Sequence, residues 1–517
     1  MGAPLVNARG IQVLSEPATP SVARRTAIGA LWMIGWRSAT RLLGFVSTLV
    51  LARLLVPADF GLVAIATSLL AVIESLSELG LRDALVRHHE SSRSLDDTAF
   101  TMQAIRGLAS GVVIGAGAWI SARWFGDERL VPLTLILAAV AVVSGLENIA
   151  VVRFQRELRF DVQFRLLLWP RLIQFSVTLV AALLWRDYWA LILGVVVARS
   201  ARVIMTYVVQ PYVPRFTLAS WRDLVGFSFW SWASSMVGMV QQRCDAFLLG
   251  PALGAAQLGV YFVATEIASL PASEVISPAA TALFAGLAAA RNSGSDVRRV
   301  AVPLIGMLIA GIAPFSLGIS ATAGYVVAGL LGPKWAGARP VIAIVALTCA
   351  IVPIGYVAVT VMNATGRIHR GVYAKIGSAL VKVGALLVVV RFPRLEWIAL
   401  ALAFVSVAEN AMYAWQLSRS ERVDWRSSLP GFARTVAACL IVALLLRSLG
   451  AGWTEVAMPA PRALLVGGAI GAATVALCFG VQFLLWWAAG RPEGAESRLL
   501  DLAKQTLPRV WRRFHPA

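Results

Sequence analysis

The sequence has few of the residues that carry out chemistry in soluble enzymes. Only 14% of its 517 residues are charged, and it contains four histidines and four cysteines. The histidines are scattered over loops and the tail. The cysteines lie in apolar stretches without the spacing of metal ligands, at Cys244, Cys349, Cys439 and Cys478. Small buried hydrophobic residues are the simplest interpretation, so we expect no metal site and no cofactor.

Long polar segments are also missing between the apolar stretches. Domains rarely fall below about 50 residues, and no connection is long enough to form one. A soluble catalytic module is therefore excluded between the helices, and we do not expect an enzyme.

What fills the chain instead is apolar sequence, at 58% hydrophobic residues. About 14 stretches have roughly 18 to 28 residues each, and a helix needs about 20 mostly apolar residues to cross a bilayer. The sequence thus predicts an all-α integral membrane protein with about 14 transmembrane helices. We place them near 27–52, 60–81, 98–122, 130–152, 164–185, 188–209, 223–249, 257–289, 300–323, 338–363, 371–390, 396–417, 432–450 and 463–488.

The net charge of +19 would suit nucleic acid, but its distribution indicates membrane topology. Connections on the side of the N-terminus hold roughly 30 Lys and Arg residues, and those on the opposite side roughly 10. The positive-inside rule then places both termini in the cytoplasm, and we expect no nucleic-acid partner. We interpret residues 1–26 as a cytoplasmic arm. The basic tail, 491–517, is either an interfacial helix on the membrane lipids or a solvated segment.

An internal repeat organises the helices. The first helix ends in ARLLVPADFGL (52–62) and the seventh in DAFLLGPALGAAQLGVY (245–261), so that in both a helix stops at Pro and the next restarts near Gly61 or Gly259. Two further pairs recur in the same order about 200 residues apart: WFGDERLVP (124–132) with LLGPKWAGARP (330–340), and RFQRELRF (153–160) with ATGRIHRGVY (364–373).

Six helices separate equivalent points, so both halves face the same way across the membrane. Such parallel repeats form two bundles related by an axis along the membrane normal. The sequence thus predicts an N-lobe at 27–215 and a C-lobe at 216–420, related by pseudo-two-fold symmetry, with two extra helices at 421–490. Chance recurrence of short Pro/Gly patterns is the alternative.

Several charges fall inside predicted helices, where they are costly and usually face a cavity or a partner. A cavity that contained the cations among them would attract an anion, and arginine matches phosphate oxygens in particular. The candidate substrate ligands are Arg37, Arg41, Arg243 and Lys382. Alternatively, these cations pair with carboxylates such as Glu74, Glu78 and Asp245 and only hold helices together. Arg106 and Arg171 either face the cavity or reach toward the membrane surface.

The intramembrane acids and one proline are candidates for ion coupling or gating. Pro271 lies between Glu266 and Glu274, and a proline in a spanning helix frees a carbonyl and kinks the helix. Kinks also occur without function. H⁺ or Na⁺ could couple to transport through one of the acids. The complete set of candidates is Glu74, Glu78, Asp245, Glu266, Glu274 and Pro271.

Several segments resemble the bacterial polysaccharide transporters. These Wzx-type flippases belong to the superfamily that includes the multidrug (MATE) exporters and the lipid II flippase, the MOP superfamily. The resemblance begins with GALWMIGWRSATRLLGFVSTLVLARLLVPADFGLVAIA (29–66) and SELGLRDALVR (77–87). It continues through LENIAVVRFQRELRF (146–160) and an Asp…Gly…Gly-x-Tyr run formed by Asp245, Gly250, Gly259 and Tyr261. It weakens after about residue 420.

The resemblance implies two six-helix lobes with helices 1, 2, 7 and 8 lining a cationic cavity. It also implies alternating access that carries an undecaprenyl-pyrophosphate-linked oligosaccharide between leaflets, as an O-antigen or exopolysaccharide repeat unit, with a polysaccharide polymerase and export machinery as partners. Arg37 matches the first-helix arginine of the family, whereas Arg41 stands at a position that is often uncharged.

Two other functions stay open. A multidrug or cation antiporter of the same superfamily would need acidic and aromatic groups in the cavity. A membrane glycosyltransferase, polymerase or ligase would need catalytic groups in a sizeable outer loop, and the predicted outer connections are short.

Overall fold

The computed structural model describes residues 40, 42–76, 85, 93–157, 159–221, 229–273, 298–421, 423, 425, 429–492 and 496–497. All regular secondary structure within these ranges is helical. The helix Leu42–Leu54 comes first. It is followed by α2 (Pro57–Leu76), α4 (Arg93–Ala116), α5 (Ala118–Phe125), α6 (Leu130–Gly145), η1 (Ile149–Val151), α7 (Val152–Arg156), α8 (Phe160–Trp185), α9 (Trp189–Val209), α11 (Phe229–Ala268), α13 (Arg298–Ala321), α14 (Ala323–Val326), η2 (Val327–Leu331), η3 (Pro333–Trp335), α15 (Ala338–Thr348), α16 (Val352–Ala364), α17 (Ile368–Val389), α18 (Leu395–Glu421), α19 (Leu429–Ser448) and α20 (Ala460–Ala488).

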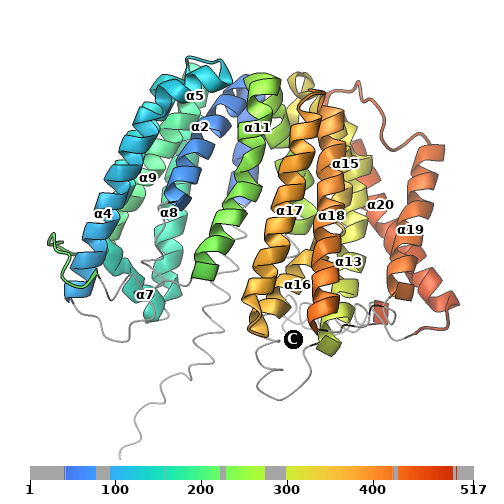
Figure 1. Cartoon of the computed structure of the whole chain (residues 1–517). Helices are drawn as coiled ribbons and strands as arrows, with labels where there is room; N and C mark the ends of the chain where they lie inside the picture. Colours follow the sequence, from blue (N-terminus) through green and yellow to red (C-terminus); the bar gives the residue numbers. More distant parts are fainter. Residues whose placement is uncertain are drawn as a thin grey trace, which may run out of the picture.

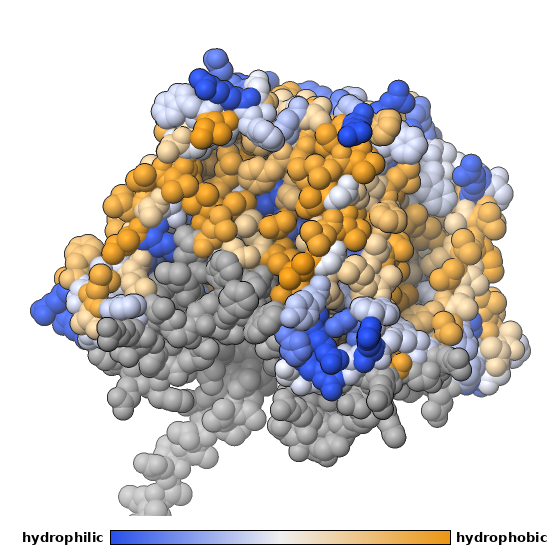
Figure 2. Space-filling view, in the orientation of Figure 1, coloured by the Kyte–Doolittle hydropathy of each residue, from blue (hydrophilic) through white to orange (hydrophobic). Residues whose placement is uncertain are grey.

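The helices are long and apolar enough for a multi-pass membrane protein. Among the described residues, ten helices can each cross a bilayer, and α15 with α16, bent by 47°, makes an eleventh span. Leu42–Leu54 and α6 are apolar but shorter. The predicted number of about 14 therefore stays a prediction. The apolar residues form a broad band around the middle of the visible face, and the hydrophilic residues gather at its upper and lower edges (Figure 2).

The span predicted at 338–363 is not one straight helix. It breaks between α15 and α16, where Pro353 occupies the first turn of α16. Proline has no N–H to donate back along a helix and its ring clashes with the preceding turn, which explains the bend. The span predicted at 98–122 changes only locally at Gly117, between α4 and α5, because this residue keeps φ −74° and ψ −8° and the helical hydrogen bonds to Val113 and from Ser121.

The helices form two lobes with α11 between them (Figure 1). In the first lobe α4 packs on α6 and α8 packs on α9, and in the second α17 packs on α18 and α13 on α15. The lobes meet chiefly through α2 and α11. The last two helices, α19 and α20, pack on each other and on α13, outside the two lobes as the repeat predicts.

The long helix α11 is a hairpin of two arms. Gly254 interrupts it with φ 70° and ψ 170°, a conformation that glycine adopts without a Cβ penalty. Asp245 and Tyr261 are 16 residues apart and would be separated by about 24 Å in a straight helix. Their side chains instead form a hydrogen bond of 2.6 Å, so the chain reverses between them. The two arms match the predicted seventh and eighth helices.

The proline at 271 interrupts the second arm as predicted. The helix α11 ends at Ala268, Ser269 forms a turn, and a short helical segment follows over 270–273. Because Pro271 has no N–H to donate toward Ile267, this break has a direct cause. Whether the break acts as a gate stays a prediction.

Candidate functional site

Two adjoining cavities lie at the junction of the lobes. The larger, about 620 Å³, is lined by α2 and both arms of α11. The smaller, about 290 Å³, is lined by Leu42–Leu54, α8 and α9, together with residues of α2 and α11. Both have Phe60, Val63, Leu191 and Glu266 in their walls. The two cavities are therefore neighbours, and we call them together the central cavity.

Polar side chains from both lobes face the central cavity. Thr67 and Ser68 of α2, Gln242 and Arg243 of the first arm of α11, and Glu266 of the second arm line its larger part. The hydroxyl of Thr48 donates a hydrogen bond to the carboxylate of Glu266, which links the first helix to the other lobe. A polar wall of this kind can hold a hydrated headgroup that lipid would exclude.

Two arginines in this wall have no acidic partner among the described residues. Within the described residues, no carboxylate lies within ion-pair distance of Arg243 or Arg171. Arg171, from α8, donates to the side-chain oxygen of Gln174 at 3.3 Å. Its neighbouring charged groups are two further arginines, Arg199 and Arg202. An intramembrane cation without a counter-ion is a place where an anionic ligand would be stabilised.

Other arginines of the N-lobe are neutralised. Arg199 pairs with Glu74 at 3.1 Å, and Arg202 pairs with Glu147 at 3.1 Å. Glu74, a candidate for ion coupling, is therefore engaged in an ion pair between α2 and α9. For this residue the structure matches the alternative in which intramembrane charges hold helices together.

Asp245 and Lys382 are also engaged with one another. The Lys382 ammonium lies 2.9 Å from one Asp245 oxygen and 3.1 Å from the other, and it also donates to the carbonyl of Gln241 at 2.5 Å. The Tyr261 hydroxyl donates to the same carboxylate at 2.6 Å. Both charged side chains are largely buried, with exposed fractions of 15% for the lysine and 10% for the aspartate. This set of groups, which we call the C-lobe ion pair, leaves neither charge free in this conformation.

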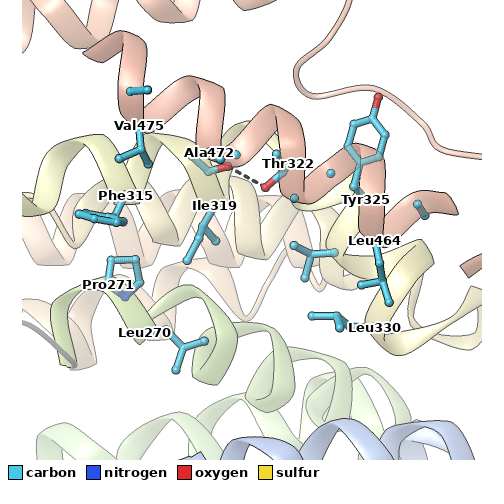
Figure 3. Close-up of a pocket in the computed structure, with 17 residues that line it drawn as sticks. Leu270, Pro271, Phe315, Ile319, Thr322, Tyr325, Leu330, Leu464, Ala472 and Val475 are labelled. Carbon is cyan, nitrogen blue, oxygen red and sulfur yellow. Dashed lines mark hydrogen bonds between the residues drawn. The ribbon is translucent and has the colours of Figure 1, made fainter. Parts of the chain in front are cut away.

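A third cavity, about 820 Å³, is an apolar groove between the second arm of α11, α13 and α20 (Figure 3). Leu270 and Pro271 lie on one side, and Phe315 and Ile319 of α13 lie next to them. The hydroxyl of Thr322 is satisfied by the carbonyl of Gly318 at 2.7 Å. The groove therefore presents almost only hydrocarbon, unlike the central cavity. It begins one residue beyond Ser269, which lines the central cavity.

Four of the predicted site residues lie outside the described residues: Arg37, Arg41, Glu78 and Glu274. Of the remaining candidates, Arg243, Asp245 and Glu266 come together in the central cavity wall, whereas Pro271 lines the apolar groove. Arg171, for which the sequence left two interpretations open, lines the smaller part of the central cavity.

Sequence reasoning missed the groove and the partners of the ion pair. A signal for the groove exists in α20, where Gly467, Gly468 and Gly471 leave a strip of helix surface without side chains. No comparable signal identifies Gln241 and Tyr261, because polar residues in helices are common and their neighbours come from elsewhere in the chain.

Comparisons with known proteins agree with this architecture. Residues 50–340, more than half of the chain, match the family described as polysaccharide biosynthesis protein. The succinoglycan biosynthesis transport protein ExoT of Rhizobium meliloti (strain 1021) is 24% identical over 514 residues, which cover 95% of this chain and 98% of the relative. The lipopolysaccharide biosynthesis protein WzxC of Escherichia coli (strain K12) is 26% identical over 334 residues, covering 63% of this chain and 65% of the relative.

Solved structures show the same fold. The lipid II flippase MurJ in an inward closed conformation superposes with a TM-score of 0.69 at 13% identity, over 87% of this chain and 98% of that one. An inward-facing multidrug resistance MATE family transporter of the MOP superfamily gives a TM-score of 0.55 at 15% identity, over 74% and 94% of the two chains. The fold is thus the two-lobed membrane fold of this superfamily.

Proposed function

The chain belongs to the polysaccharide biosynthesis protein family, and from this premise we propose that it is a flippase for a lipid-linked oligosaccharide. The substrate would be a repeat unit joined to undecaprenyl pyrophosphate, moved between the leaflets of a bacterial inner membrane. The names of its relatives, a succinoglycan transport protein and a lipopolysaccharide biosynthesis protein, support a role in transport during polysaccharide synthesis.

The observation that carries the proposal is the pair of arginines, Arg171 and Arg243, which line the central cavity and have no acidic partner among the residues that the structure describes. They come from different lobes, so a ligand that contacts both would bridge the two lobes. Guanidinium groups bind pyrophosphate oxygens through short, charge-assisted hydrogen bonds. A cationic drug would be repelled by the same two charges, which favours the flippase over a multidrug antiporter.

The apolar groove supports the same substrate. A polyprenyl chain cannot enter a polar cavity without losing the hydrophobic stabilisation of about 0.8 kcal/mol per buried CH₂ group. It must therefore stay in lipid or in an apolar channel while the sugar crosses. The groove beside Ser269 and Leu270 is positioned for this, and we assign the first part of the polyprenyl chain to it.

The remaining assignments extend the proposal. Arg37 and Arg41 lie outside the described residues, but Arg37 precedes Thr40 by three positions and Gly44 by seven, the spacing of one helix face. Since Thr40 and Gly44 line the smaller cavity, we include Arg37 and Arg41 among the pyrophosphate ligands. We place both termini in the cytoplasm, with N-lobe 27–215 and C-lobe 216–420 as the moving units. Glu266 lines both parts of the cavity, and we keep it as a candidate for H⁺ or Na⁺ coupling.

The test compares variants of the two cavity arginines with a control variant on α8. Arg171→Ala combined with Arg243→Ala removes two charge-assisted contacts, each worth about 1.5–3 kcal/mol, so binding of the pyrophosphate carrier should weaken at least tenfold for each one lost. Arg165→Ala is the control, because Arg165 also lies in α8 but is 60% exposed and paired with Asp161.

The measurement is translocation of a fluorescent undecaprenyl-pyrophosphate oligosaccharide in proteoliposomes. Polysaccharide export by the complemented deletion strain, at matched membrane levels of each variant, gives the cellular readout. Wild-type rates for the double variant would refute the anion site. Drug sensitivity of the deletion strain with normal polysaccharide export would favour the antiporter instead. Arg37→Ala and Arg41→Ala extend the same series.

A further inference from the structure

Two glycines bring the lobes into backbone contact. A Cβ placed on Gly61 of α2 would lie 1.8 Å from the carbonyl oxygen of Ala255, and one on Gly259 would lie 1.9 Å from the carbonyl oxygen of Pro57. These distances are far below van der Waals contact. The nitrogen of each glycine also lies within 2.9 Å of the other's virtual Cβ. Only glycine at both positions allows α2 and the second arm of α11 to approach this closely.

The contact has the symmetry of a two-fold axis. Pro57 precedes Gly61 by four residues, just as Ala255 precedes Gly259, and each glycine abuts the residue one helical turn before the other glycine. A residue that contacts its own equivalent is the hallmark of an interface on a two-fold axis. The two glycines are also the equivalents that the sequence repeat identified.

Further bonds between the lobes lie around this contact. The indole N–H of buried Trp335 donates to the carbonyl of Ala52 at 2.9 Å. Arg53 donates to the carbonyl of Leu330 at 2.8 Å and also to the carbonyls of Ala328 and Gly329. On the other side of the axis, the indole of Trp124 donates to the carbonyl of Phe247 at 3.4 Å.

The glycine contact adjoins the wall of the central cavity. Phe60, next to Gly61, lines both parts of the cavity and meets the edge of Trp335 with ring centroids 5.3 Å apart. Tyr261, two residues after Gly259, also lines the cavity. The glycine contact therefore blocks a path from the cavity between α2 and the second arm of α11.

We infer that the contact between Gly61 and Gly259 closes the central cavity on the side of Pro57 and Gly254, and that the hydrogen bonds of Trp335 and Arg53 stabilise this closed conformation. The inference rests on the proposed function insofar as that function requires the cavity to open alternately to the two sides. In the conformer open to the Pro57 side, the two glycines must separate and the bonds to Ala52 and to residues 328–330 must break. A side chain at either glycine would favour that conformer.

The experiment measures access to the cavity from outside the cell. Thr67→Cys places a reporter thiol in the cavity wall, and a membrane-impermeant maleimide labels it in intact cells. The wild-type chain with its four native cysteines gives the background. Gly61→Ala and Gly259→Ala are each combined with the reporter. Gly311→Ala and Gly384→Ala are matched controls, because both glycines lie in helices and nothing lies within 4 Å of a Cβ at either.

We expect the labelling rate to rise at least severalfold for Gly61→Ala and for Gly259→Ala, and to stay at the level of the reporter alone for both control variants. Trp335→Phe keeps the ring against Phe60 and removes only the N–H, so it should raise labelling by a smaller factor. If the glycine variants do not reach the membrane, Trp335→Phe and Arg53→Gln test the closure instead. Unchanged labelling in the variants that are present would overturn the inference. No substrate is added, so the outcome is independent of which cargo the protein carries.

Discussion

The C-lobe ion pair gives the sharpest prediction about stability. Asp245 and Lys382 are nearly buried, and the aspartate also accepts the Tyr261 hydroxyl. Asp245→Asn removes the carboxylate in contact with the ammonium, which then keeps only its electrostatic interaction with Glu409, and Lys382→Met leaves the Asp245 carboxylate without its cation. Removing one member of a buried pair typically costs about 3–5 kcal/mol, because the remaining charge is left uncompensated. We expect each single variant to lose stability within this range.

The double variant separates pairing from packing. With both charges removed, no isolated charge stays buried, so the loss should fall short of the sum of the single losses by about 1–3 kcal/mol. The assay is reversible unfolding in SDS, followed by tryptophan fluorescence. Arg165 with Asp161 serves as the control cycle, since these side chains are 60% and 47% exposed and such pairs couple by less than about 1 kcal/mol.

Two outcomes would refute this reasoning. Additive losses in the Asp245–Lys382 cycle would mean that the two charges do not stabilise one another. A coupling as small as that of the control pair would mean that water reaches the site freely. Either result would return both residues to the set of candidate substrate and ion ligands.

Two more predictions follow from the geometry. Gly468→Leu should fill the apolar groove and slow translocation in proteoliposomes without loss of protein, because nothing lies within 4 Å of a Cβ at this position. Gly480→Leu is the control, since a Cβ there is equally unobstructed but the residue does not line the groove, and it should leave the translocation rate unchanged. Equal rates for the two variants would argue against a polyprenyl chain in the groove. In the loop before α6, the hydrogen bond from Arg129 lowers the pKa of Asp127, so the pair stabilises the fold above the ordinary aspartate pKa and ceases to do so as the pH falls through the lowered value. The melting temperatures of the native chain and of Arg129→Ala should differ only slightly at neutral pH, because the arginine is 49% exposed and exposed ion pairs contribute little. The difference should vanish in acid. A difference that persists in acid would contradict the stabilising role of this ion pair.

The membrane class and the two-lobed plan could be predicted from the sequence, because both depend on local patterns. Long apolar runs identify helices that cross lipid wherever they occur. The repeat around Gly61 and Gly259 identified equivalent points, and the structure brings these two points into contact. The same comparison predicted that one helix ends near Pro251 and the next restarts near Gly259, and the structure places the reversal between them, at Gly254.

The roles of individual charges could not be predicted in the same way. Lys382 and Asp245 are 137 positions apart, and no local pattern relates one to the other. A carboxylate on another helix decides whether an intramembrane arginine is neutralised, as for Arg199, or available, as for Arg171. Sequence spacing shows which residues share a helix face, but not which face of the next helix meets it.

The bare backbone crossing on the axis restricts how the two halves of the chain can change. A larger side chain at either position would occupy the same narrow space, so a substitution elsewhere in the other half cannot compensate for it. Each half therefore has to retain its small residue for as long as the other half is its neighbour, however far the rest of the two sequences drift apart.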